Sequence, residues 1–188
     1  FQANELIINV TNALRRRTLE LDNRRHRLEL ENLVEERTIE LVNAREESIL
    51  ILSKAAEFRD DETAKHTIRI GFFCEMIARW MGKPESFCKL LRAAAPLHDV
   101  GKIGVPDSIL LKPGKLTDEE FETIKSHCRI GYRILSESTS ETFKLGAEIA
   151  LNHHEKYDGS GYPNGLKAEE IPVSGRIVAV CDVFDALT

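Results

Sequence analysis

Residues 98–116 read HDVGKIGVPDSILLKPGKL, and the fold is organised around the adjacent histidine and aspartate that open this stretch. Imidazoles and carboxylates together form the ligand set of first-row transition metals. A carboxylate beside a histidine can also bridge to a second ion. Other residues of these types are spread at wide intervals along the chain: His66, His127, His153, His154 and Asp182. The pattern predicts a cluster of two or more metal ions, with hydrolysis as its chemistry.

Length and composition narrow the class of protein. The 188 residues can form one good core, or a small domain with an extension. The content of 42% hydrophobic and 30% charged residues is ordinary for a soluble globular protein. A net charge of −5 gives no reason to expect binding to a nucleic-acid polymer, which favours a basic face. Metal ions would supply the positive charge that an anionic substrate requires.

The cysteines and the apolar runs indicate the cellular compartment of the protein. Four cysteines occur without a C-x-x-C pair, so we expect them to be reduced, buried and not zinc ligands. No run approaches the ~20 apolar residues of a membrane span, and no signal peptide is evident. These features favour the cytoplasm, with a membrane-anchored parent protein left as an alternative.

The first part of the chain predicts one long helix. Residues 4–58 contain no glycine or proline and are rich in strong helix formers. Apolar residues recur every seven positions from Ile7 to Leu28, and a second phase begins at Leu30, so we expect a register break between them. The seam favours a dimeric coiled coil over residues 1–56. The alternative is a single helix packed on its own domain. His26 is expected to face solvent.

The remainder, residues 57–188, predicts further helices joined by loops. We expect helices at about 60–81, 84–100, 117 onward through His127, 141–155 and from 174 to the end, with a turn-rich loop at 157–172. No alternating pattern marks a sheet. The expected fold is all-α, a helical bundle preceded by the long helix, and a bundle suits ligands that come from several segments.

Spacing and burial qualify the candidate ligands. Glu62 and His66 are four residues apart and would share one helix face. Asp182 lies in an apolar run, where a carboxylate without a partner is costly. Any single histidine is more often an ordinary core or surface residue than a ligand, and the acidic residues 60–62 can be read as a helix cap. The joint pattern outweighs these alternatives.

Three stretches closely resemble the HD-GYP family: residues 98–116, HHEKYDGSGYPNGL at 153–166, and RIVAVCDVFDALT at 176–188. These proteins are helical cyclic di-GMP phosphodiesterases within the HD hydrolase superfamily, and the resemblance covers about 57–188. It implies metal-dependent hydrolysis of cyclic di-GMP to pGpG and/or GMP. Residues 1–17 resemble the last helix of a receiver domain, which implies a response regulator regulated through the helical linker. A sensor or another regulatory module before the coiled coil is the alternative.

The resemblance also assigns roles to residues. It implies two or three divalent ions, iron or manganese, with Asp99 bridging between two of them. The ligands common to HD hydrolases match His66, His98, Asp99 and Asp182. The ligands of a second ion match His127, His153 and His154, and the acidic ligand of a third ion matches Glu62. Lys102 matches a lysine that reaches a phosphate oxygen, so Asp99 and Lys102 are the implied catalytic residues.

The implied substrate contacts lie mainly in one loop. They are Lys102, Asp60, Gly159, Gly161, Tyr162 and Pro163. Alternatively, Lys102 is a surface lysine and Tyr162 a packing residue. The family continues beyond the position of Thr188 with basic residues, so the domain is expected to be incomplete at its C-terminal end. Two other functions stay open: a catalytically weak cyclic di-GMP sensor or scaffold, and a phosphodiesterase for another cyclic dinucleotide such as cGAMP.

Overall fold

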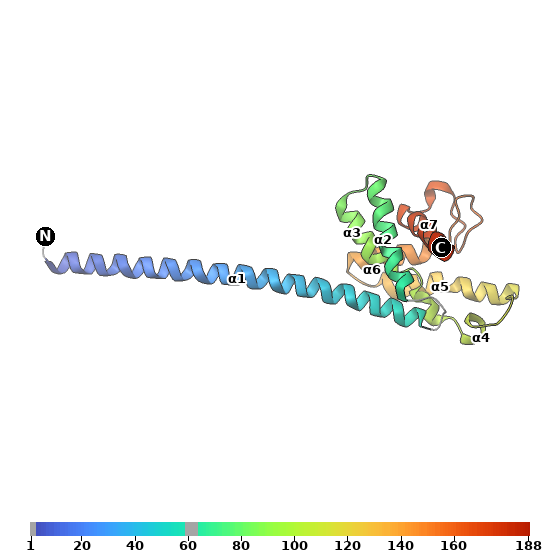
Figure 1. Ribbon diagram of the computed structural model, residues 1–188, viewed down its shortest axis with the longest axis horizontal. Coiled ribbons are helices and arrows are strands. Elements are labelled where there is room, and N and C mark those ends of the chain that lie inside the picture. The colour runs from blue at the N-terminus through green and yellow to red at the C-terminus, as the bar shows by residue number, and fades with distance from the viewer. Residues whose placement is uncertain (1–2, 59–63) are drawn as a thin grey trace. The chain divides into compact units, whose positions relative to one another are not determined.

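The computed structural model describes residues 3–58 and 64–188, and the prediction of an all-α fold is confirmed because no strand occurs in these ranges (Figure 1). The α-helices are α1 (Ala3–Glu57), α2 (Ala64–Trp80), α3 (Glu85–Ala94), α4 (Asp107–Leu110), α5 (Asp118–Ser136), α6 (Glu141–Asn152) and α7 (Val173–Ala186). Short 3-10 turns lie at η1 (Ala95–Leu97), η2 (Val100–Gly104) and η3 (Ala168–Glu170).

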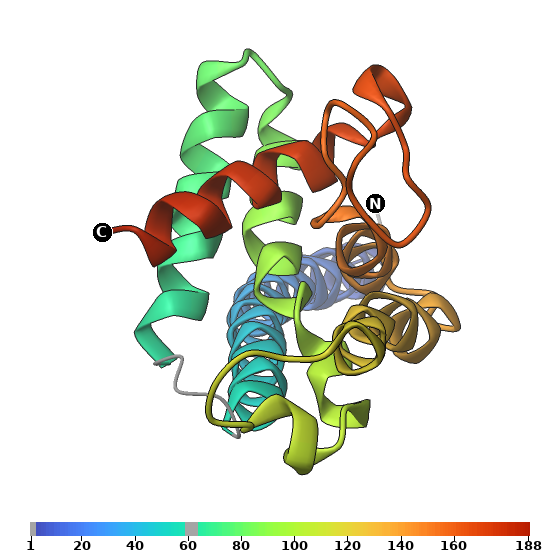
Figure 2. The same cartoon turned by 90° about the vertical axis from the view of Figure 1, so that its right-hand side faces the viewer.

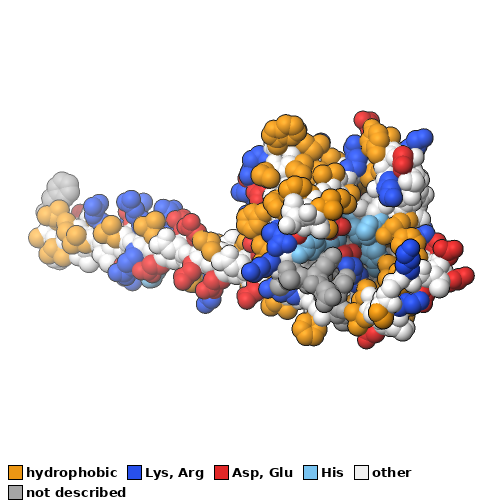
Figure 3. All heavy atoms as spheres, turned by 45° about the vertical axis from the view of Figure 1, so that its right-hand side comes forward, with side chains coloured by type: hydrophobic (Ala, Val, Ile, Leu, Met, Phe, Trp, Pro, Cys, Tyr) orange, Lys and Arg blue, Asp and Glu red, His pale blue; other side chains and the backbone are white. Residues whose placement is uncertain are grey.

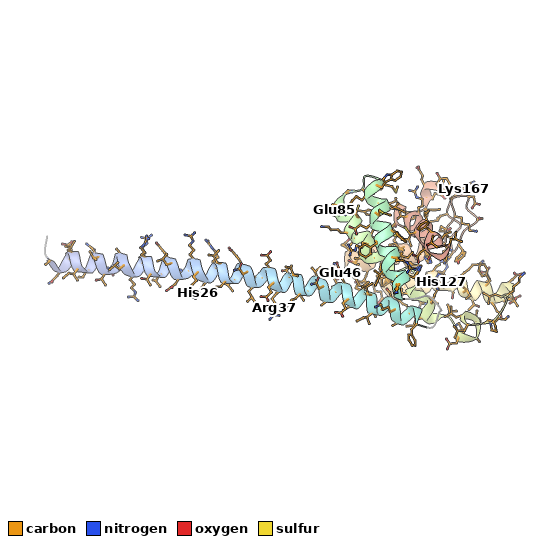
Figure 4. The ribbon with its side chains drawn as sticks, in the orientation of Figure 1. His26, Arg37, Glu46, Glu85, His127 and Lys167 are labelled. Carbon is orange, nitrogen blue, oxygen red and sulfur yellow. The ribbon has the colours of Figure 1, made fainter. Side chains whose placement is uncertain are left out.

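The chain forms two compact units, one ending at Arg45 and the other beginning at Glu46, and helix α1 contributes residues to both. In the first unit the heptad residues Ile7, Leu14, Leu21 and Leu28 are 51–63% exposed. Such a row of exposed apolar side chains is unusual for a helix that stays alone in water. His26 is exposed, as predicted, and projects from this helix (Figure 4). None of the described helices is both long enough and apolar enough to span a bilayer.

The second unit, Glu46–Thr188, contains the main core. Ile70 of α2, Leu91 of α3, Ile149 of α6 and Val178 of α7 lie in one fully buried apolar cluster. Helix α7 runs across α2 (Figure 2), so the last helix of the chain is packed directly on the first helix after α1. The core also buries Cys74, Cys88 and Cys181. All four cysteines are free and buried, as expected.

A second apolar cluster attaches the end of α1 to this unit. Ile49 and Ala56 of α1 are 2% and 1% exposed, and they pack with Leu97 and Val100. Those two residues flank the His98–Asp99 pair. The last two turns of the long helix therefore share their packing with the segment that carries the first predicted ligands.

Several helix ends differ from the predictions. Helix α3 ends at Ala94 and not near Val100, because the chain tightens into η1, with Pro96 in its first turn. Helix α6 ends at Asn152 and not at Glu155, so His153 is its C-terminal cap. The predicted helix start at 117 is confirmed, and Thr117 forms a capping box with Thr117 N–H donating to Glu120 Oε2 at 2.7 Å. The predicted start of α2 at residues 60–62 lies outside the described residues.

Candidate metal centre

Seven predicted ligands, drawn from five segments, meet in two adjoining clusters. One cluster contains Asp99, His127, His153 and His154, and the other contains His66, His98 and Asp182. Within each cluster the candidate ligand atoms all lie within 4.8 Å of one another. Figure 3 shows histidine side chains reaching the surface on one face of the domain, beside lysine, arginine and hydrophobic side chains. Asp60 and Glu62, also predicted for the site, lie outside the described residues.

Asp99 lies where the two clusters meet. Its Oδ1 is 3.3 Å from His127 Nε2 and 3.4 Å from His153 Nε2, while its Oδ2 is 3.4 Å from His98 Nε2. One carboxylate thus faces imidazoles of both clusters with different oxygens. This is the placement that a bridging ligand needs.

These atoms fit metal coordination better than a hydrogen-bonded network. His98 Nε2 and Asp99 Oδ1 are buried, and neither makes a hydrogen bond within the described part of the chain. Buried polar atoms without partners are costly and call for an explanation. Ligand atoms at ~2.1 Å from one ion stand about 3.0–3.4 Å apart along the edges of an octahedron or tetrahedron. The observed separations of 3.3–3.4 Å agree with such edges.

Three of the histidines are oriented by the same kind of hydrogen bond, from Nδ1 to a backbone carbonyl. His98 Nδ1 donates to Ala95 O at 2.9 Å, His127 Nδ1 to Ile124 O at 2.6 Å, and His153 Nδ1 to Ala150 O at 3.1 Å. Each carbonyl lies three residues earlier along the chain. A proton held on Nδ1 leaves the Nε2 lone pair for a metal ion, which is the usual arrangement of metal-binding histidines.

His66 is oriented by a carboxylate, and sequence reasoning missed it. His66 Nδ1 donates to Asp185 Oδ2 at 2.6 Å, which turns His66 Nε2 toward Asp182 Oδ1 at 3.5 Å. Arg69 holds the same carboxylate in two hydrogen bonds, at 2.5 and 2.6 Å. One signal was available, because Asp182 and Asp185 are three residues apart on α7 and share a face.

The charges around the clusters favour the ionised form of the Asp99 carboxylate, and they shift the pKa values of the histidines in opposite directions. Burial opposes ionisation of Asp99, but the imidazoles of His98, His127 and His153 hold its pKa well below the usual range. Burial lowers the pKa of His154 to about 2, so this imidazole is neutral. Against the effect of burial, Asp99 raises the pKa of His98 to about 9 and that of His127 to about 10. In the metal-free chain, two candidate ligands therefore carry protons that a bound ion would displace.

Lys102 lies at the edge of the centre. Its ammonium is 2.9 Å from Asp99 Oδ2, and its side chain is 14% exposed. It reaches the bridging carboxylate from η2, three residues along the chain. A cation here can meet the negative charge of a phosphate as well as that of the carboxylate.

The loop after α6 brings Tyr162 to the centre. Its ring centroid is 4.7 Å from that of His154, and burial raises the pKa of its hydroxyl. Gly161 lies against the backbone of the preceding turn, since a Cβ there would be 2.2 Å from Lys156 N. Gly159 has a φ of +84°, in the region that glycine tolerates best. Pro163 follows Tyr162 through a cis peptide bond.

Glu155 holds the loop that carries Tyr162 through hydrogen bonds, and this role was not predicted from the sequence. The carboxylate is 4% exposed and accepts hydrogen bonds from Asn164 N at 2.7 Å and Leu166 N at 2.9 Å. From α5, Arg129 donates to Pro163 O at 3.1 Å. The position directly after His153 and His154 was the available signal. The loop that carries Tyr162 is thus held from both sides.

Comparison with known proteins agrees with this geometry. An HD domain family model matches residues 50–188. The chain is 56% identical over 158 residues to a cyclic di-GMP phosphodiesterase of Thermotoga maritima, covering 84% of this chain and 43% of that protein. It is 51% identical to the cyclic di-GMP phosphodiesterase response regulator RpfG of Xanthomonas campestris, covering 75% and 37%.

A third relative has a different named substrate. The 3'3'-cGAMP-specific phosphodiesterase 2 of Vibrio cholerae is 46% identical, covering 79% of this chain and 28% of that protein. The chain spans less than half the length of each of these three relatives. The chain belongs to the HD domain family, as its HD-GYP motifs predicted.

Proposed function

We propose that this chain carries a metal-dependent phosphodiesterase that hydrolyses cyclic di-GMP to pGpG and/or GMP. The observation that carries the proposal is the pair of His/Asp clusters that meet at Asp99, with ligand atoms within 4.8 Å in each. Relatives that are 56% and 51% identical are named cyclic di-GMP phosphodiesterases. We assign the catalytic domain to residues 57–188 and the linker to residues 1–56.

The donor set suits divalent metal ions, and we propose iron or manganese. Imidazole and carboxylate together match the preferences of both metals. His66, His98 and Asp182 would hold one ion, His127, His153 and His154 another, with Asp99 shared between them. Glu62 is the candidate ligand of a third ion. When bound, such ions lower the pKa of a coordinated water and stabilise negative charge on a phosphate.

Residues of the chain itself neutralise charge on the phosphate and position the dinucleotide. Lys102, 2.9 Å from Asp99, neutralises a non-bridging phosphate oxygen and so favours the more highly charged transition state. Tyr162, Gly159, Gly161 and Pro163 form the wall that positions the dinucleotide. Asp60 is a further substrate contact carried over from the family resemblance.

A hydrolysis assay tests this function. The chain is loaded with Mn²⁺ or, without oxygen, with Fe²⁺, and products are separated by chromatography while metal content is measured by mass spectrometry. We expect pGpG or GMP from wild type, and loss of most metal and turnover in Asp99→Ala. His26→Ala, which alters an exposed histidine of α1, should match wild type. An Asp99→Ala variant with full metal and full turnover would refute the assignment.

Two alternatives have distinct outcomes in the same assay. Tight binding of cyclic di-GMP by the metal-loaded chain, without product, would favour a sensor or scaffold. Faster cleavage of 3'3'-cGAMP than of cyclic di-GMP would favour the hybrid dinucleotide, which the names of three Vibrio cholerae relatives support at 46%, 38% and 34% identity.

We also propose that α1 forms a homodimeric coiled coil that connects the domain to an upstream receiver domain in the cytoplasm. The exposed heptad residues support it, since pairing would bury them. Light scattering should give twice the mass of one chain, and Leu21→Lys should give a monomer. Arg16→Lys, a change outside the apolar row, should stay dimeric. A monomeric wild type at micromolar concentration would contradict the coiled coil.

A further inference from the structure

A cavity of about 490 Å³ lies between α5 and the loop that carries Tyr162. It is lined by Glu122, Lys125, Ser126, Arg129, Gly161, Tyr162 and Pro163. Tyr162 connects it to the metal centre, because the ring that forms its wall is 4.7 Å, centroid to centroid, from His154. A ligand group in this cavity is therefore a near neighbour of a phosphate at the metal cluster.

The wall of the cavity contains one aromatic ring, that of Tyr162, and the ring of Phe121 lies next to it outside the lining. The rings of Phe121 and Tyr162 are 6.0 Å apart and nearly perpendicular. Lys125 Nζ lies 5.0 Å from the centroid of Phe121 and 5.7 Å from that of Tyr162. Aromatic side chains are the usual stacking partners of single nucleobases, whatever the base. Stacking alone would bind any nucleobase here.

Three charged side chains can distinguish between bases. Residues three and four apart share a helix face, so Glu122, Lys125 and Arg129 line one side of α5. Lys125 Nζ donates to Glu122 Oε1 at 2.5 Å, which sets a cationic donor beside an anionic acceptor. Arg129 is tethered at the loop, where its Nη2 donates to Pro163 O and Asn164 Oδ1, both at 3.1 Å.

We propose that this cavity binds one guanine base of the substrate, an inference that rests on the proposed hydrolysis of a cyclic dinucleotide. The adjacent donor and acceptor match the edge of guanine: Lys125 donates to O6, and Glu122 accepts from N1–H and the N2 amino group. Arg129 donates to N7. Adenine presents an amino group in place of O6 and an acceptor in place of N1–H, so it opposes both Lys125 and Glu122.

A guanine-selective cavity beside the metal centre sets the orientation of the substrate. In 3'3'-cGAMP the two phosphodiester bonds differ only in which base lies on which side. If guanine occupies the cavity, one of these bonds is presented to the metal centre, and one of the isomers pGpA and pApG predominates. The isomer ratio reports base recognition independently of the overall rate.

The test is hydrolysis of 3'3'-cGAMP by the metal-loaded 188-residue chain, with pGpA and pApG separated by chromatography. We expect about a tenfold excess of one isomer in wild type, the selectivity of one good base contact. Glu122→Gln should bring the ratio toward one, because an amide can pair with adenine as well. Glu119→Gln, an exposed change outside the cavity on the same helix, should keep the wild-type ratio.

A second comparison uses kcat/KM for cyclic di-GMP relative to cyclic di-AMP. We expect Glu122→Gln and Arg129→Met to lower this preference about tenfold, while Arg133→Met, one turn further along α5, leaves it unchanged. Equal isomers in wild type, or variants that slow every substrate by the same factor, would overturn guanine recognition and leave the phosphodiesterase in place.

If the chain is not a phosphodiesterase, a binding experiment still tests the cavity. If the metal-loaded chain cleaves no cyclic dinucleotide, calorimetry with pGpG and pApA decides. A preference for pGpG that Glu122→Gln abolishes would retain the cavity and reject the hydrolase. Equal affinities, or binding of neither, would reject the cavity as well.

Discussion

His66 Nδ1 and Asp185 Oδ2 are 2.6 Å apart although 119 residues separate them in the chain. The Asp185 side chain is 3% exposed and is also held by Arg69 in two hydrogen bonds. A carboxylate behind a metal-binding histidine fixes the ring and strengthens its bond to the ion. Asp185 thereby links α7 to α2 at the point where both contribute candidate ligands.

Replacing Asp185 by asparagine should weaken metal binding. We expect about a 10- to 100-fold loss of affinity at the cluster that contains His66, the usual cost of removing such a partner. Competition with a chromophoric chelator measures the affinity, and mass spectrometry measures the metal content. Asp22→Asn on α1 is the control. An unchanged affinity in Asp185→Asn would show that His66 does not depend on this carboxylate.

Metal binding should release protons. His98 and His127, with pKa values raised to about 9 and about 10, carry protons at pH 7 in the metal-free chain. An ion must displace both, so apparent metal affinity should rise with pH up to about pH 10 and fall on acidification. Calorimetry in two buffers of different ionisation enthalpy counts the protons, and we expect about two. His26→Ala should release the same number, and a count of zero would contradict the prediction.

The carboxylate of Glu155 should control the loop that carries Tyr162. Glu155→Gln replaces one acceptor oxygen by an amino group that faces a backbone N–H, which should cost about 1–3 kcal/mol of unfolding free energy. Because we propose that the loop forms the wall that positions the substrate, KM should rise more than kcat falls. Thermal unfolding and steady-state hydrolysis measure the two effects. Glu169→Gln, an exposed change in the same loop, is expected to behave as wild type. Equal losses in both variants would argue against this role.

Gly101 should tolerate no side chain. A Cβ at this position would lie 1.9 Å from His127 O and 2.5 Å from Gly131 N, and neither backbone atom can move alone. Gly101→Ala should therefore cost about 3 kcal/mol or more and separate His98 and Asp99 from His127. Chemical denaturation and metal analysis test this.

Gly104→Ala is the matched control for that prediction. It lies in the same turn, but the nearest atoms to its Cβ would belong to the side chain of Ile130, which can rotate. We expect a smaller loss of stability and an intact metal content. If the two variants unfolded at the same denaturant concentration, close approach at Gly101 would not be what holds η2 on α5.

Local features of this fold could be predicted from the sequence, whereas features that depend on long-range packing could not. The helices could be predicted because helix formers and turn residues act locally, and the convergence of the histidines was predicted from the joint pattern of ligand types and the HD-GYP resemblance. The early ends of α3 at Ala94 and of α6 at Asn152 could not, because packing of η1 and of the following loop decides them. The partners of His66 and the role of Glu155 depend on contacts across the fold. The spacing of Asp182 and Asp185, and the position of Glu155 after His154, were signals but did not identify those contacts.

One apolar cluster contains Ile49 and Ala56 of α1 together with Leu97 and Val100, which flank His98 and Asp99. Buried atoms in such a cluster are close-packed, so a displacement of one is felt by the others. This limits where the chain can be joined to another protein by genetic fusion. A junction before Glu46 leaves the cluster whole, whereas a junction between Ile49 and Ala56 removes part of the packing around the His98–Asp99 pair.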